Sequence, residues 1–241
     1  AIGNCLTPCP LEVNPMASIN PQTSWTDIIG SAAGNVAARE RFATTYEPVV
    51  RSYLAARWAN VPLAAAIDDG VQDVFVECFR AQGVLERVNP ETVPSFRGYL
   101  FGVLKNVARR YEAKDRIASL PDQLEADDTS ASAAFDREYA LAMMREASYI
   151  QAALATKKGA AAERRIELLQ LRFGQGLPVR EIAKRWEVDP AWVHHQYATA
   201  RSEFQEALEC LIQQHEPRLS AAEVTQRCRD LLQALSGKNQ T

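Results

Sequence analysis

Residues 177–209 constrain the fold most, because apolar side chains recur there at helical spacing on both sides of one short break. The break reads Glu187-Val188-Asp189-Pro190. Asp189 suits the N-cap of a following helix, since its carboxylate accepts a hydrogen bond from a free N–H of the first turn, and Pro190 suits the first helical position. The stretch therefore predicts two helices joined by a tight turn, which is the helix-turn-helix pattern of many DNA-binding proteins.

The second of these helices has two different sides. Val193, Tyr197 and Ala200 lie on an apolar side together with Phe204 and Leu208. The remaining positions are rich in hydrogen-bond donors and form our candidate DNA surface: Pro190, Trp192, His194, His195, Gln196, Thr199 and Arg201. Taken alone, the stretch also fits an ordinary helical hairpin whose outer side is only solvated.

The overall charge of the chain restricts where nucleic acid could bind. The 241 residues are 47% apolar and 24% charged, as in ordinary soluble globular proteins, and the net charge is −3. This composition argues against a uniformly basic, histone-like binder, so any nucleic-acid surface is local. No run approaches the roughly 20 apolar residues that span a bilayer, so we expect no membrane insertion.

The five cysteines, Cys5, Cys9, Cys78, Cys210 and Cys228, bear on location and metal binding. An odd number in a helical chain with no recognisable secretory signal favours a reducing, cytoplasmic setting. Cys5 and Cys9 have no histidine or third cysteine near them, so we expect no metal site and no cofactor. Residues 1–24 contain four prolines and are expected to form a flexible leader.

Residues 64–85 predict an amphipathic helix. Its apolar side carries residues that fall on one helical face: Ile67, Val71, Val74, Phe75, Cys78 and Phe79. Its other side is acidic and polar, with Asp68, Asp69, Gln72, Asp73 and Glu77. That side is either simply solvated or a docking surface for a basic partner.

Residues 96–116 predict a second amphipathic helix, and its outer side is basic. The buried set is expected to be Phe96, Leu100, Val103, Leu104, Val107 and Tyr111. Against two acidic residues, Glu112 and Asp115, the segment has six basic ones: Arg97, Lys105, Arg109, Arg110, Lys114 and Arg116. In an acidic protein this local excess is a candidate phosphate-contacting stripe, and the interleaved Tyr99 and Asn106 are candidates for contacts with bases. A basic surface helix without a ligand is the alternative.

The other segments outline two domains. The acidic, small residues of 118–135 have little to bury and predict a flexible acidic linker. Helices resume at 136 and continue to 213, and a C-terminal helical extension covers 214–241. We therefore expect an all-α protein in which two small helical domains, 25–117 and 136–213, are joined by the linker, with the helix-turn-helix in the second.

Three of these segments, in this order, resemble bacterial RNA polymerase sigma factors of the extracytoplasmic-function type, within the sigma-70 superfamily. The family's polymerase-docking helix is similar to DDGVQDVFVECFR, its promoter-melting and −10-reading helix to FRGYLFGVLKNVARRYEAKDR, and its −35-reading domain to RIELLQLRFGQGLPVREIAKRWEVDPAWVHHQYATAR. Two places depart from the family's pattern. Leu177-Pro178 replaces a Ser or Thr cap, and His194-His195 replaces a Lys or Arg followed by a small polar residue.

The resemblance implies a transcription initiation factor whose partners are core RNA polymerase, promoter DNA, and an anti-sigma factor or other regulator. Polymerase docking would fall to Asp69, Gln72, Asp73 and Phe75. A loop at 89–95 would receive a flipped base. The −35 element would meet residues 190–201, and the −10 DNA would lie on Tyr99, Lys105, Asn106, Arg109, Arg110 and Lys114.

Two other classes of protein remain open. A helix-turn-helix repressor or activator that does not bind polymerase explains 177–209 but leaves the two preceding helices unexplained. A helical protein-interaction module, such as a regulator that sequesters another factor, needs no DNA contact. An enzyme is disfavoured, because no Ser/His/Asp or Cys/His set, phosphate loop or metal cluster stands out, and adjacent His194 and His195 point about 100° apart on a helix.

Overall fold

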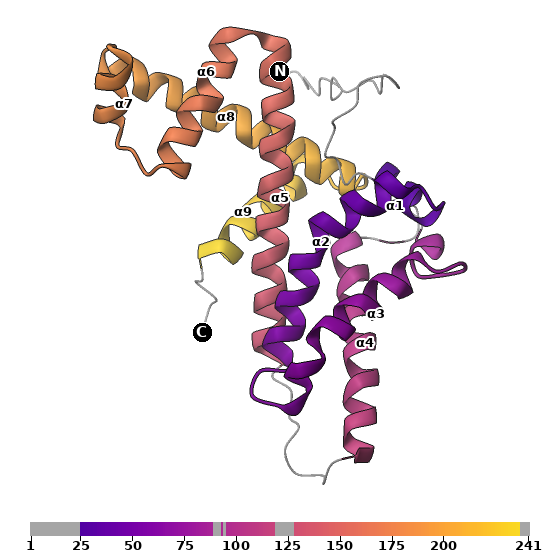
Figure 1. Cartoon of the computed structure of the whole chain (residues 1–241). Coiled ribbons are helices and arrows are strands. Elements are labelled where there is room, and N and C mark those ends of the chain that lie inside the picture. Colours follow the sequence, from indigo (N-terminus) through magenta and orange to yellow (C-terminus); the bar gives the residue numbers. More distant parts are fainter. Residues whose placement is uncertain (1–24, 89–92, 94, 119–127, 237–241) are drawn as a thin grey trace.

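The computed structural model describes residues 25–88, 93, 95–118 and 128–236, and all regular structure among them is helical (Figure 1). The predicted all-α class is therefore confirmed for this part of the chain. The leader 1–24, most of the 89–95 loop and residues 119–127 of the expected linker lie outside the described residues. The helices are α1 (Trp25–Ala32), α2 (Val36–Arg57), α3 (Ile67–Phe79), α4 (Phe96–Ala118), α5 (Asp128–Lys158), α6 (Ala160–Leu169), α7 (Val179–Trp186), α8 (Pro190–His215) and α9 (Ala221–Ser236).

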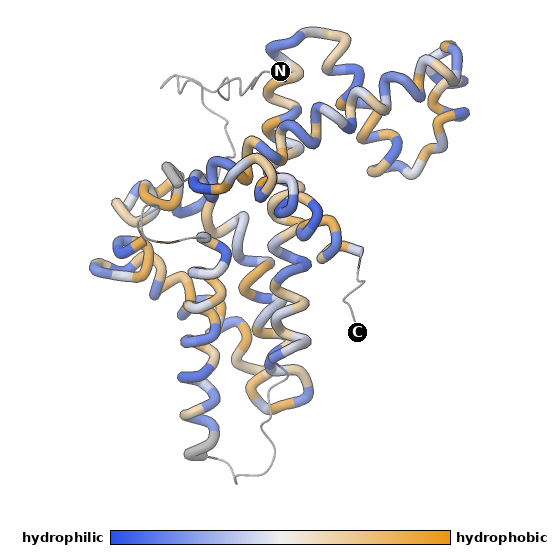
Figure 2. The backbone as a smooth tube through the Cα atoms, turned by 180° about the vertical axis from the view of Figure 1, so that it is seen from behind, coloured by the Kyte–Doolittle hydropathy of each residue, from blue (hydrophilic) through white to orange (hydrophobic). Residues whose placement is uncertain are grey.

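Helix α2 is the centre of the larger hydrophobic core. It begins after Asn35, whose Oδ1 accepts a hydrogen bond from the Ala38 N–H at 3.0 Å. Phe42, Tyr46 and Tyr53 have no exposed surface, because α1, α3, α4 and α5 all pack against this helix. Figure 2 shows hydrophobic and hydrophilic positions alternating along the long helices, as expected where each helix buries one side.

Helix α3 approaches α2 closely at a glycine. A Cβ added at Gly70 would lie 2.9 Å from Trp58 Cη2 and 3.0 Å from Leu54 Cδ1, so a larger residue would push the two helices apart. Val71, Val74 and Cys78 of α3 are buried, as the sequence predicts. Asp69 and Gln72 therefore remain on the solvent side of α3, where both are exposed.

A buried ion pair joins α2 to α4. The Arg57 guanidinium donates two hydrogen bonds to Glu112, at 2.6 and 3.0 Å, and Trp58 Nε1 donates a third to the same carboxylate at 3.3 Å. Arg57 also donates to Asp128 Oδ1 at 2.6 Å. The hydrogen bonds to Glu112 raise the pKa of Arg57, so this residue stays charged and holds α2, α4 and the start of α5 together.

Helix α5 begins earlier than the sequence suggests. The sequence predicts a linker over 118–135, whereas the structure has helix from Asp128 onward. Ala131 and Phe135 are fully buried one turn apart, and the Phe135 ring packs against Phe101 with the ring centres 5.1 Å apart. Arg57 and Lys105 both donate to Asp128 at the first residue of the helix. These contacts with the preceding helices account for helix formation in a stretch that looks weakly apolar by itself.

The same α5 helix takes part in both halves of the chain. Its first half lies beside α2 and runs in the opposite direction (Figure 1). Its second half packs against α6 and α8, where Gln151 Nε2 donates to the Ala200 carbonyl oxygen at 2.8 Å. With 31 residues it is about 46 Å long. One continuous helix therefore connects the α2–α4 core to the α6–α8 unit.

The C-terminal helix α9 covers α5 and α8. Val224, Cys228 and Leu231 are buried on its inner side, and Arg227 pairs with Glu216 at 2.9 Å. Among the described residues, every helix is too short or too polar to cross a bilayer.

The Arg57–Glu112 pair yields the first prediction. Glu112→Ala should lower the free energy of unfolding by about 3 kcal/mol. This loss is near the lower end of the range for a broken buried ion pair, because Asp128 still neutralises part of the Arg57 charge. Urea unfolding of both proteins measures the difference. Arg51→Ala is the matched control, since its pairs with Glu47 and Asp68 are solvent-exposed and should be worth less than about 1 kcal/mol. Equal losses in the two variants would contradict a structural role for the buried pair.

Candidate nucleic-acid interface

The basic outer side of α4 is only partly free. Asn106, Arg109 and Lys114 are exposed. Lys105 donates to Asp128 Oδ2 at 2.7 Å, and Arg110 pairs with Glu77 of α3 at 2.6 Å. Four of these five residues carry positive charge, and two of the four are already paired with carboxylates of neighbouring helices.

Tyr99, the sixth −10 candidate, takes part in a tertiary contact. It is half-buried, and its hydroxyl donates to the Val84 carbonyl oxygen at 2.7 Å. Burial raises the pKa of Tyr99. The structure therefore ties this tyrosine to the segment between α3 and α4, close to the start of the 89–95 loop.

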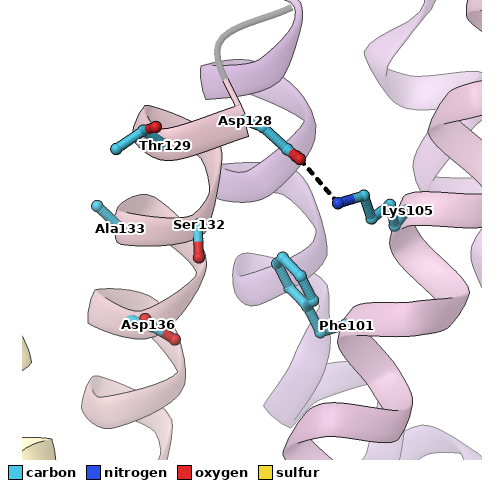
Figure 3. A pocket seen from close by; sticks show the side chains of 7 residues that line it. All are labelled: Phe101, Lys105, Asp128, Thr129, Ser132, Ala133 and Asp136. Atoms are coloured by element: carbon cyan, nitrogen blue, oxygen red, sulfur yellow. Dashed lines mark hydrogen bonds and ion pairs between the residues drawn. The ribbon is translucent and has the colours of Figure 1, made fainter.

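Helices α4 and α5 face each other through two ion pairs across an open cavity. Arg97 pairs with Asp136, and Lys105 pairs with Asp128. Figure 3 shows the Lys105–Asp128 pair, with the Phe101 ring below it pointing from α4 toward α5. The hydrogen bond from Lys105 is the main reason why the pKa of Asp128 lies below its ordinary value. The cavity is about 470 Å³ and is also lined by Thr129, Ser132 and Ala133.

The predicted polymerase-docking residues occupy two environments on α3. Asp69 and Gln72 are exposed. Asp73 is half-buried and accepts a hydrogen bond from the Tyr111 hydroxyl at 2.9 Å. Burial, followed by this hydrogen bond, raises the pKa of Tyr111 to about 12. Phe75 is half-buried against the Phe42 ring, with ring centres 6.3 Å apart, so it contributes to the core.

An exposed valine lies on the same face of α3. Val76 is 54% exposed and follows Asp69, Gln72 and Asp73 at helical spacing. The sequence pattern did not single it out, because Val76 breaks the polar character of that face. Val76 thus adds one exposed apolar side chain to the otherwise polar face formed by Asp69, Gln72 and Asp73.

The connection between α7 and α8 has well-defined backbone geometry. Glu187 adopts the left-handed conformation, with φ 54°, and the Val188 N–H donates to the Ala183 carbonyl oxygen at 3.0 Å. Asp189 Oδ1 accepts from the Ala191 N–H at 2.6 Å, and Pro190 is the first residue of α8. A small hydrophobic core of five buried residues holds α7 and α8 together: Leu168, Leu171, Ile182, Ala183 and Val193.

The predicted −35 residues lie along the first half of α8. Gln196 and Thr199 are half-buried: Gln196 Oε1 accepts from Arg165 Nη1 at 3.5 Å, and Thr199 Oγ1 donates to the His195 carbonyl oxygen at 3.2 Å. The others are exposed, namely Pro190, Trp192, His194, His195 and Arg201.

The sequence reasoning missed the basic residues on α6 and α7. Arg164, Arg180, Lys184 and Arg185 are all exposed around the α7–α8 unit. Residues 157–201 contain nine Lys or Arg against five Asp or Glu, in a chain whose net charge is −3. A window count of charge over this segment would have found them. This local excess of positive charge would attract the negatively charged phosphate groups of a nucleic acid.

A partly buried ion pair fixes α6 to α8. Arg165 donates to both carboxylate oxygens of Glu203, at 2.9 and 2.6 Å. Lys158 lies 3.7 Å from the same carboxylate. The hydrogen bonds from Arg165 hold the pKa of Glu203 below its ordinary value. Arg165 is therefore a structural residue of this unit.

Comparison with known proteins adds no relative to this description. No protein-family model matches the chain, and a search of curated proteins finds no match.

The lowered pKa of Glu203 predicts how stability depends on pH. Because the folded protein binds this proton less tightly than the unfolded chain, the stabilisation is present at neutral pH and is lost as the pH falls through the lowered pKa. Glu203→Gln should cost about 1–2 kcal/mol at pH 7, and the difference from wild type should shrink toward pH 3. Thermal unfolding across this range measures it, with the exposed Glu206→Gln as control. A difference that stays constant from pH 7 to pH 3 would contradict the assignment.

Proposed function

We propose that this protein is a sigma factor that binds core RNA polymerase, recognises the −35 and −10 elements of promoters and promotes DNA melting. The α7–α8 unit is the observation that carries DNA binding in this proposal. Its tight turn leads into α8, which has Asp189 as N-cap and Pro190 as first residue, a buried apolar side and exposed donors on the outer side. A helix-turn-helix that enters the major groove needs such a turn and such an outer side, so the unit supports the proposal.

The proposal assigns DNA contacts to two regions. His194, His195 and Gln196 on α8 would read base edges at −35, with Arg201 on a phosphate. The exposed Asn106, Arg109 and Lys114 of α4 would hold the −10 DNA. Extruding a base from the stack costs a few kcal/mol, so binding of the flipped base near the 89–95 loop would have to offset that cost.

The proposal also assigns separate roles to the two halves of the chain. Residues 25–117 would serve polymerase docking and −10 binding, and residues 136–213 would serve −35 binding. The exposed acidic face of α3, with Asp69 and Gln72, supports a basic partner surface for the first half. Such a factor acts as a binding protein without catalytic residues or cofactor, it works in the cytoplasm, and an anti-sigma factor or other regulator would control it.

A repressor or activator that binds DNA without polymerase is the second candidate. The α7–α8 unit supports it equally well, whereas α3 gives it no support. Transcription from a promoter library by bacterial core polymerase, with and without the purified protein, separates the two. Promoter-specific transcripts that depend on the protein support the sigma factor. Tight operator binding by the protein alone, with no effect on core polymerase, supports the repressor.

Polymerase docking predicts a selective loss on α3. Asp69→Arg combined with Gln72→Ala reverses one exposed charge and leaves the Asp73–Tyr111 hydrogen bond intact. Recovery of core polymerase in a pull-down should fall more than tenfold, because a reversed charge against a basic surface costs several kcal/mol. The melting temperature should stay nearly the same, since exposed substitutions change stability by about 0.5 kcal/mol or less.

Glu40→Arg on α2 is the matched control for the α3 variant, because it makes the same change of charge at another exposed position. It should recover polymerase as wild type does. Equal recovery by wild type and the α3 double variant would remove the support for polymerase docking.

Base recognition by α8 predicts two kinds of effect. His195→Ala and Gln196→Ala should each relax the preference at one base pair of the −35 element, by about 1–3 kcal/mol for a direct contact. Arg201→Ala should weaken binding to all sequences alike. Sequencing the promoters that polymerase uses from a randomised −35 library, with each variant, measures both. Unchanged promoter selection in the first two variants would exclude α8 as the −35 reader.

A further inference from the structure

Arg164 of α6 is held against two tryptophans at the α7–α8 turn. Its guanidinium carbon lies 4.7 Å from the centre of the Trp186 ring and 5.5 Å from that of Trp192. The two rings meet edge to face, with centres 6.5 Å apart and an angle of 71° between their planes. One tryptophan ends α7, and the other lies in the first turn of α8. Arg164 thus reaches from a third helix to the junction of the other two.

This arrangement fixes the direction of the cation while leaving it exposed. A guanidinium that lies over an aromatic face keeps the N–H groups along its edge free for other hydrogen bonds. Arg164 is exposed, and Trp192 is 39% exposed. An unrestrained arginine loses rotamer freedom when it binds, whereas a stacked one has already lost much of it. A phosphate group that approaches here therefore meets a preorganised donor.

The neighbouring Arg165, unlike Arg164, is neutralised by a carboxylate. Arg165 points to α8 and is occupied by both oxygens of Glu203. Arg164 contacts aromatic faces, which neutralise none of its charge. The two adjacent arginines therefore lie in different environments, and of the two only Arg165 is neutralised by a carboxylate of the described residues.

We propose that Arg164, held by Trp186 and Trp192, binds a backbone phosphate of duplex DNA and thereby positions the start of α8 in the major groove. The proposal rests on the proposed function only in that α8 binds DNA. Residues in the first turn of such a helix approach the base edges, and the phosphates that flank the groove lie beside them. Arg164 stands over Trp192 in that turn, where a flanking phosphate would pass.

Salt dependence of DNA binding by the full chain tests the assignment. Fluorescence anisotropy of a labelled 30-base-pair duplex between roughly 50 and 200 mM salt gives the slope of log K against log salt. Each phosphate contact contributes about 0.9 to that slope, equivalent to roughly eightfold in affinity at 0.1 M salt. Arg164→Gln, which removes the charge but keeps an aliphatic stem over the rings, should reduce the slope by about 0.9.

Two further variants separate a phosphate contact from other effects. Arg164→Lys keeps the charge and should retain the wild-type slope. Arg229→Gln removes the same charge from an exposed position on α9 and should also leave the slope unchanged. A merely structural role for Arg164 would change the melting temperature without changing the slope.

Each outcome decides the question. A reduced slope in Arg164→Gln alone supports the proposal. A wild-type slope in Arg164→Gln, or an equal reduction in Arg229→Gln, overturns it while leaving the proposed function standing. If the wild-type protein fails to bind duplex even at the lowest salt, DNA binding by α8 is overturned together with the role of Arg164.

Discussion

The packing of α2 against α5 is the contact on which the rest of the structure depends. The Tyr46 and Tyr139 rings stack across it with ring centres 6.3 Å apart. Nearer the start of α5, the Phe135 ring packs edge to face against the Tyr53 ring. Because α5 then continues into the contacts with α6 and α8, the direction of α8 is set by a helix anchored on the other core. Under the proposed function, this would hold the two DNA-contacting helices, α4 and α8, at a defined separation.

Helix α5 also determines which positive charges on α4 are free to bind a ligand. Arg97 and Lys105 face α5 and pair with Asp136 and Asp128, whereas Arg109 and Lys114 remain exposed. A phosphate that replaced Asp128 on Lys105 would exchange one anion for another, so the gain from that contact would be small. Under the proposed function, the cations that add most to DNA affinity are those left unpaired by α5.

Sequence periodicity predicted the elements that bury a face of their own, and it failed where stability comes from distant residues. Val71 and Val74 on α3, and Val193 on α8, are buried as their spacing indicates. The first turns of α5 were read as linker because Asp128 and its neighbours offer little apolar surface, yet Arg57 and Lys105 stabilise that end from 71 and 23 residues away. Such pairings leave no periodic signal. Arg164 was missed for the same reason, since only the fold brings α6 beside both tryptophans.

Exposure distinguishes the residues on α3 that can bind a partner from those that hold the helix in place. Phe75 contacts the Phe42 and Phe79 rings, and Asp73 is engaged by Tyr111, so neither is wholly available to a partner. Asp69 and Gln72 are available, and Val76 lies beside them with 54% of its surface exposed. Asp69 and Gln72 are therefore the predicted docking residues that a partner can reach directly. Under the proposed function these exposed residues would contact polymerase, whereas a repressor that binds DNA alone assigns them no role beyond solvation.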